Sequence, residues 1–175
     1  MGLDVVFLCL GNICRSPMGE RVALSHVRDT PWADLVRATS AGASGEEEGN
    51  PMDPRARAVL DRHGYDALTP HVAHRITDAE ARRADLVVAA ERRHLDALTR
   101  RGLDLSGGRG VLLTSYVPGA RPGSPLPDPW YGPAAAFEET LTVLEAAMPA
   151  FLADLGQRLD SAGRKPASGR TDRTA

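Results

Sequence analysis

This sequence has few cysteines, little net charge and no long hydrophobic run. Two cysteines in 175 residues are too few for a disulfide framework, which favours a reduced, cytoplasmic protein. A net charge of −2 disfavours a general nucleic-acid binder, because such proteins are usually clearly basic. No apolar run approaches the roughly 18 residues of a membrane span, and the short N-terminal run carries Asp4 where a signal peptide would be basic. We therefore expect no membrane partner and no nucleic-acid partner.

Short apolar runs alternate with helical patterns along the chain, in the order that βαβ units produce. The apolar runs predict strands at 5–9, 35–41, 85–90 and 110–116. The clearest helical patterns lie at 53–64, at 91–102 and from Phe137 to Leu155. This order predicts an α/β fold: a four-stranded parallel sheet with helices on both faces and a phosphate-binding loop after the first strand.

Capping signals predict where several helices begin. Ser16 followed by Pro17 is typical of an N-cap and the first helical position. Asp53 has the same relation to the proline that follows it, and Thr77 with Glu80 forms a capping box. Each of these pairs satisfies backbone N–H groups that a helix start leaves without partners.

The second half of the chain has two features of its own. Residues 117–132 contain too many prolines and glycines for regular structure, and Pro149 is expected to kink or divide the last helix. From Ser161 onward the residues are small, polar and basic, which is typical of a disordered tail. We therefore expect one domain over 1–160 and a disordered tail over 161–175.

The segment CLGNICRS, residues 9–16, lies between the first strand and a helix start, and we call it the phosphate loop. Gly11 and Asn12 tolerate positive φ, so successive N–H groups can turn inward as a nest. The helix N-terminus adds further N–H groups, and Arg15 adds a planar fork suited to two phosphate oxygens. These features predict a cradle for a tetrahedral dianion. Its remaining members are Leu10, Ile13, Cys14 and Ser16.

Cys9 is expected at the floor of this cradle, where N–H donors and a cation favour its thiolate form. A thiolate below a phosphoryl group can accept that group and later release it to water, and Ser16 can stabilise the departing sulfur. A zinc site is disfavoured, because no second cysteine pair and no zinc-finger histidine spacing accompany Cys9 and Cys14. A pair of inert core cysteines would not explain the glycine, asparagine, arginine and serine around them.

The chain resembles the low-molecular-weight protein tyrosine phosphatases. Their signature Cys-x5-Arg-Ser follows the first strand, and CLGNICRSP at 9–17 is similar to it. DPWYG at 128–132 is similar to the family's late Asp-Pro-aromatic-Tyr-Gly loop. TSAG, DPRARAVLDRHG and DLVVAAE resemble family segments between these two, so the resemblance runs from about Val5 to Leu159.

The resemblance implies hydrolysis of phosphotyrosine in proteins through a cysteinyl-phosphate intermediate. Cys9 would be the nucleophile, Arg15 the phosphate clamp and Asp128 the general acid, which then activates water. An acid suits this reaction, because phenol has a pKa of about 10 and its anion leaves poorly. The resemblance also implies a polar network that supports the loop, and no metal or organic cofactor. That network consists of Asn12, Ser16, Ser40 and His71.

The sequence departs from the family pattern near the substrate cleft. Glu46 occupies a position where many relatives carry tryptophan, and Trp130 one where tyrosine is common. Ala90 and Glu91 replace a usual Met-Asp, and we expect none of these changes to touch the nucleophile, clamp or acid. Apolar walls from Ile13, with Trp130 or Tyr131, favour phosphotyrosine over the shorter phosphoserine. Glu46 favours basic residues around the phosphotyrosine.

Three other functions remain as alternatives. An arsenate reductase of this fold needs more cysteines than Cys9 and Cys14. A phosphoarginine phosphatase tends to carry threonine where this chain has Ile13, and a non-catalytic phosphotyrosine-binding module would be expected to lose Cys9 or Asp128. Within the leading interpretation, Cys9 is expected to oxidise readily and Cys14 to resolve it as a disulfide. A monomer is favoured.

Overall fold

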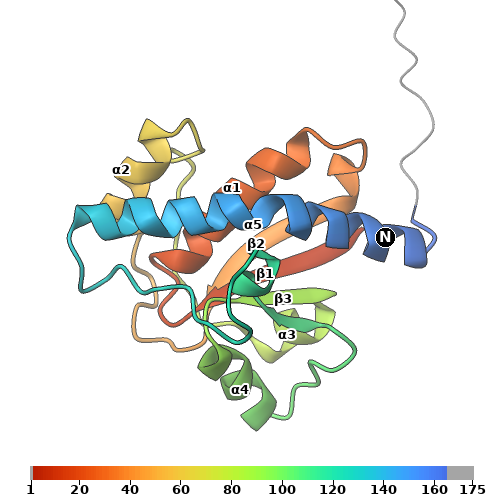
Figure 1. Ribbon diagram of the computed structural model, residues 1–175. Helices are drawn as coiled ribbons and strands as arrows, with labels where there is room; N and C mark the ends of the chain where they lie inside the picture. The colour runs from red at the N-terminus through yellow and green to blue at the C-terminus, as the bar shows by residue number, and fades with distance from the viewer. Residues whose placement is uncertain (1, 165–175) are drawn as a thin grey trace, which may run out of the picture.

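The computed structural model describes residues 2–164, which are built around one parallel sheet (Figure 1). The strands are β1 (Leu3–Cys9), β2 (Val36–Gly42), β3 (Leu86–Ala89) and β4 (Gly110–Leu112), in the order β2-β1-β3-β4. All three pairings are parallel, so the strands' carboxyl ends share one edge, with Cys9 opposite Gly42 and Leu8 opposite Ala89. The predicted α/β fold is therefore confirmed, and this edge carries the phosphate loop.

Helices cover both faces of the sheet (Figure 1). One face packs against α1 (Arg15–Arg28) and α5 (Ala134–Ser161), with α2 (Pro54–Arg62) beside them. The other face packs against α3 (Asp78–Arg83) and α4 (Arg92–Arg100). Alternation along β1 makes both cores possible: Val5 and Phe7 belong to the first, Val6 and Leu8 to the second.

Two predicted helix starts have the expected capping bonds. The side chain of Asp53 accepts a hydrogen bond from the backbone N–H of Arg55 at the start of α2. At the start of α3, Thr77 and Glu80 form both bonds of the capping box. These local signals succeed because the partners lie within three residues of each other.

One local prediction is wrong, and two others are wrong in part. The helix after the phosphate loop starts at Arg15, and Ser16 does not cap it because its hydroxyl points to Cys9 instead. Of the run 110–116, only Gly110–Leu112 pairs with the sheet, and Leu113–Tyr116 forms a 3-10 turn. Pro149 does not divide α5: it faces solvent, while buried Met148 and Phe151 on either side of it pack on one core. A kink at Pro149 stays a prediction.

The C-terminal end of the described chain contacts the sheet's other end. Helix α5 includes Ser161, and the guanidinium of Arg164 donates to the backbone oxygen of Gly2. Residues 165–175 lie outside the described residues, so the expected disorder of the tail stays a prediction. Within 2–164, no helix is long and apolar enough to cross a membrane.

Candidate active site

The phosphate loop leaves the end of β1 and enters α1 through a single left-handed residue. Asn12 has a φ of 63° and is the one non-glycine residue with positive φ among residues 2–164. Gly11, expected to share that role, does not adopt positive φ. Its missing side chain instead makes room for the segment opposite that carries Glu47, because a Cβ there would lie 2.7 Å from Cγ of Glu47.

A buried polar network holds the turn. The amide of Asn12 donates to Oγ of Ser16 at 3.0 Å, and that hydroxyl lies 3.0 Å from Sγ of Cys9. Oδ1 of Asn12 accepts from the backbone N–H of His74 at 3.1 Å. Nε2 of His71 bonds the carbonyl oxygen of Asn12 at 2.6 Å, so that nitrogen carries the proton. Burial lowers the pKa of His71 and so favours the neutral ring, while the bond to Asn12 acts in the opposite direction.

Ser40 lies elsewhere than its family role suggests. Its hydroxyl bonds Oε2 of Glu20, on α1, at 2.5 Å, and makes no hydrogen bond to residues 9–16. Ser40 is nevertheless buried on β2, next to the strand that ends at Cys9. The side-chain hydrogen bond of Ser40 therefore reaches α1, the helix that the phosphate loop enters, and not the loop itself.

Arg15 is enclosed by acceptors from two other elements. Its side chain is 2% exposed, and Nη1 donates to Oε1 of Glu91 at 2.6 Å and to the carbonyl oxygen of Leu126 at 3.1 Å. Nη2 donates to Oδ2 of Asp128, also at 2.6 Å. The guanidinium thus links the end of β3 to the segment that carries the candidate acid.

Glu91 is one of the departures from the family pattern, and we expected none of them to touch the nucleophile, clamp or acid. Its contact with Arg15 shows that this expectation is wrong. Burial acts to raise the pKa of Glu91, but hydrogen bonds from Arg93 and Arg15 outweigh it and lower the pKa to about 2. Glu91 is therefore a permanent carboxylate beside the clamp. A signal for this existed in the sequence, since Glu91 follows a strand that was expected to end at the same sheet edge as the phosphate loop.

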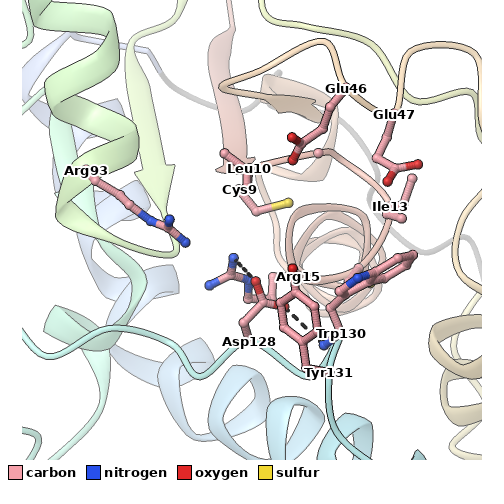
Figure 2. A pocket seen from close by; sticks show the side chains of 12 residues that line it. Cys9, Leu10, Ile13, Arg15, Glu46, Glu47, Arg93, Asp128, Trp130 and Tyr131 are labelled. Atoms are coloured by element: carbon pink, nitrogen blue, oxygen red, sulfur yellow. Dashed lines mark hydrogen bonds and ion pairs between the residues drawn. The ribbon is translucent and has the colours of Figure 1, made fainter.

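Asp128 lies on the irregular segment 117–133, which we call the acid loop. Its side chain is 31% exposed, and Oδ1 accepts from the backbone N–H of Trp130 at 3.1 Å. Figure 2 shows Asp128 and Arg15 joined at the base of a cavity, with Cys9 facing the same space. The structure thus brings the candidate nucleophile, clamp and acid together.

The cavity has a volume of about 340 Å³ and is open to solvent on one side. Its wall includes three residues proposed for the cleft, Glu46, Trp130 and Tyr131, and also Ile13. Trp130 is 39% exposed, whereas Tyr131 is 93% exposed and forms the outer rim. The lining consists of Cys9, Leu10, Gly11, Ile13, Cys14, Arg15, Glu46, Glu47, Arg93, Asp128, Trp130 and Tyr131.

Sequence reasoning missed two charged residues of this wall. Glu47 lies beside Glu46, so the rim on that side is acidic. Arg93 projects from the first turn of α4 on the opposite side (Figure 2), and its guanidinium bonds Glu91 at 2.9 Å. Glu47 belongs to the same acidic run as Glu46, whereas Arg93 has no motif around it that would have identified it.

Two buried titratable groups lie near the clamp. Cys14 is a free thiol, and burial, together with the negative charge of Asp53, raises its pKa. His94 is 1% exposed, and neither of its ring nitrogens has a hydrogen-bond partner among the described residues. Burial, with Arg15 nearby, lowers the pKa of His94 to about 4, so the ring is neutral at pH 7. Among residues 2–164, no three side chains of His, Cys, Asp or Glu gather where they could hold a metal ion.

Comparison with known proteins connects this geometry to a family. The model of the low molecular weight phosphotyrosine protein phosphatases matches residues 4–163. The chain is 42% identical over 162 residues to the low molecular weight protein-tyrosine-phosphatase of Streptomyces coelicolor, covering 91% of this chain and 98% of that one. The match includes all three catalytic candidates.

Solved structures share the fold across different substrates. The tyrosine phosphatase amsI of Erwinia amylovora is 28% identical, with a TM-score of 0.73, and the match covers 88% of this chain and 93% of that one. The YwlE arginine phosphatase of Geobacillus stearothermophilus is 23% identical, with a TM-score of 0.75 over 91% and 96% of the two chains. Fold similarity therefore does not separate tyrosine from arginine dephosphorylation.

Proposed function

This chain belongs to the low molecular weight phosphotyrosine protein phosphatases, a family of hydrolases, and we propose that it dephosphorylates tyrosine in proteins through a phosphocysteine at Cys9. One observation carries the proposal: Cys9, Arg15 and Asp128 line one cavity, with Arg15 bonded to Asp128 at 2.6 Å. Ser16, 3.0 Å from Sγ of Cys9, supports the same assignment.

The first step transfers the phosphoryl group to sulfur. The phosphate dianion binds the N–H groups of the phosphate loop and competes with Asp128 for Nη2 of Arg15. Sγ of Cys9 attacks phosphorus, the bond to the tyrosine oxygen breaks, and a protonated Asp128 gives its proton to that oxygen.

The second step returns the enzyme to its starting state. Asp128, now ionised, takes a proton from water as the water oxygen attacks phosphorus, and the sulfur–phosphorus bond breaks. Ser16 can donate its hydroxyl hydrogen to either Sγ of Cys9 or the carbonyl of Ala41, which lies 3.2 Å away. A shift of that hydrogen toward sulfur stabilises the departing thiolate.

The cavity supports phosphotyrosine as the substrate. A tyrosine ring is long enough to reach from the rim at Tyr131 toward the floor at Cys9, with Ile13 and Trp130 as apolar walls. Phosphoserine is too short to fill that space. Glu46 and Glu47 make one side of the rim acidic, which supports a preference for basic residues around the phosphotyrosine.

The thiols bear on where the enzyme works and how it is regulated. Cys9 and Cys14 are both free, and a nucleophilic thiolate needs a reducing compartment, so we place the enzyme in the cytoplasm. Peroxide would oxidise Cys9 to a sulfenic acid with release of water. Attack by the sulfur of Cys14 would then form a disulfide and release a second water.

The decisive experiment measures aryl phosphate hydrolysis by the unmodified enzyme, Cys9→Ser and Arg15→Ala. We expect both variants to lose at least roughly 10³-fold in kcat/KM, and EDTA to leave the unmodified rate intact. Thermal unfolding checks that each variant is folded. Appreciable turnover by folded Cys9→Ser contradicts the covalent route. A preference of the unmodified enzyme for phosphoarginine over phosphotyrosine peptides contradicts the substrate assignment.

A further inference from the structure

The acid loop has no helix or strand to hold Asp128 in place, so its position depends on anchors at each side. Upstream, the backbone N–H of Leu126 donates to the carbonyl oxygen of Ala90 at 2.8 Å, and the Leu126 side chain is buried. This bond ties the loop to the end of β3. Downstream of Asp128 the chain turns at the surface, where Gly132 N–H bonds the carbonyl oxygen of Pro129 at 2.9 Å.

Arg55, at the start of α2, is the anchor downstream. Its Nη1 donates to the carbonyl oxygen of Gly132 at 3.1 Å, and its Nη2 donates to that of Trp130 at 3.2 Å. The guanidinium also lies over two aromatic rings, 5.7 Å from the Trp130 centroid and 4.6 Å from that of Phe137. One side chain therefore holds the backbone and the aromatic wall that directly follow Asp128.

Asp53 holds Arg55 in turn. Its two carboxylate oxygens accept from Nε and Nη2 of Arg55 at 3.1 and 2.9 Å, and the Asp53 side chain is buried. The backbone N–H of Asp53 donates to the carbonyl oxygen of Ile13, in the phosphate loop, at 2.8 Å. A continuous set of bonds thus runs from the phosphate loop through Asp53 and Arg55 to the acid loop.

We propose that Arg55 is a positioning residue that sets where Asp128 stands relative to Cys9. Because Arg55 is tied to the phosphate loop through Asp53, it fixes the acid loop against the loop that carries the nucleophile. The inference rests on the proposed role of Asp128 as the proton donor. Arginine is required because its planar fork bonds a carboxylate and two carbonyls while lying over rings, which an ammonium group cannot do.

The test compares two aryl phosphates, phenyl phosphate with a poor leaving group and p-nitrophenyl phosphate with an activated one. Arg55→Lys keeps the positive charge beside buried Asp53, so it is the main variant, and Arg55→Ala is the second. If Asp128 is displaced, only the substrate whose leaving group needs its proton should react more slowly. We expect Arg55→Lys to lower kcat/KM about 10- to 100-fold for phenyl phosphate and less than about threefold for p-nitrophenyl phosphate, because kcat/KM reports the step in which the leaving group departs. Arg57→Lys, exposed on the same helix, is the matched control and should change neither rate.

A double substitution tests whether Arg55 acts through Asp128. If it does, the double variant should have a kcat/KM for phenyl phosphate less than about threefold below that of Asp128→Asn alone. Fluorescence gives a readout independent of activity: in a Trp32→Phe background, Arg55→Lys should increase acrylamide quenching of Trp130, whereas Arg57→Lys should not.

Each outcome bears on one claim. The positioning role is overturned if Arg55→Lys slows both substrates equally. It is also overturned if the losses from Arg55→Lys and Asp128→Asn multiply in the double variant. The proposed function stands in either case. Unchanged quenching of Trp130 overturns the positioning role as well. If Asp128→Asn alone loses the same factor on both substrates, the proton-donor role fails and this inference falls with it.

Discussion

The phosphate loop and the acid loop face each other across one cavity and are held in different ways. Asn12, Arg15 and Ser16 in the phosphate loop are nearly fully buried, and bonds inside the loop link Asn12, Ser16 and Cys9. In the acid loop, Trp130 and Tyr131 are exposed. Bonds within that loop, such as those of Asp128 with Trp130 and of Pro129 with Gly132, join residues two or three apart, and the place of the loop depends on distant elements.

This difference separates two kinds of substitution. A change within the phosphate loop should affect every substrate, because the loop holds the phosphoryl group that all substrates share. A change in the acid loop should affect a substrate in proportion to its need for a proton. The leaving group therefore reports which loop has been disturbed.

The largest expected effect is that of Asp128→Asn. It should lower kcat/KM for phenyl phosphate by about 10²–10⁴-fold and that for p-nitrophenyl phosphate far less, because only the poorer leaving group needs the proton in the first transfer. Initial rates at substrate concentrations well below KM measure the two kcat/KM values, which exclude the hydrolysis step that both substrates share. Arg15→Ala is the contrasting variant, with losses on both substrates. If Asp128→Asn slowed both substrates by the same factor, Asp128 would not be the acid.

Next in size is the effect of His94, which lies near Arg15, on the pH dependence of the free energy of unfolding. Unfolding raises the pKa of His94 from about 4 to 6.5, so below pH 6.5 the unfolded chain binds a proton that the folded chain does not. The free energy of unfolding therefore decreases as the pH falls. Between pH 7.5 and 5, the free energy of unfolding should decrease by about 2 kcal/mol less for His94→Asn than for the unmodified protein. Urea unfolding at the two pH values checks this, and parallel losses would contradict the shift.

A smaller effect is expected from Cys14→Ser after oxidation. The raised pKa of Cys14 keeps its thiol protonated, so disulfide formation should be slower than the oxidation of Cys9. After peroxide treatment and a delay of minutes, thiol reductant should restore several-fold more activity to the unmodified enzyme than to Cys14→Ser. Equal recovery at every delay would remove the resolving role.

The smallest expected effect concerns the rim. Glu46→Gln should narrow the ratio of kcat/KM between basic and acidic phosphotyrosine peptides by about two- to fivefold, because exposed charge pairs contribute little. The same peptides at high salt should show a narrower ratio in the unmodified enzyme. Glu139→Gln, exposed on α5 and absent from the cavity wall, is the control. A ratio unaffected by Glu46→Gln would exclude it from peptide selection.

The phosphate loop was predictable because its determinants are adjacent in the chain. One octapeptide contains the nucleophile, the clamp and the left-handed Asn12, between an apolar strand and a helix start. The same local logic predicted the caps at Asp53 and Thr77. It failed at Ser16, where a buried interaction with Cys9 takes the hydroxyl that would have capped α1.

What the sequence determined by itself is the set of local conformations and the family: β1, the phosphate loop, the capped helices and the motif at Asp128. Only the tertiary structure decided the surroundings of Arg15, because Glu91 and Asp128 are 76 and 113 residues from it. It likewise decided the bonds of Arg55 to the acid loop, which span 75 and 77 residues. Such contacts depend on which strand ends and loops the sheet order brings together. The strand before Glu91 indicates its edge of the sheet, but no local pattern encodes which side chains meet there.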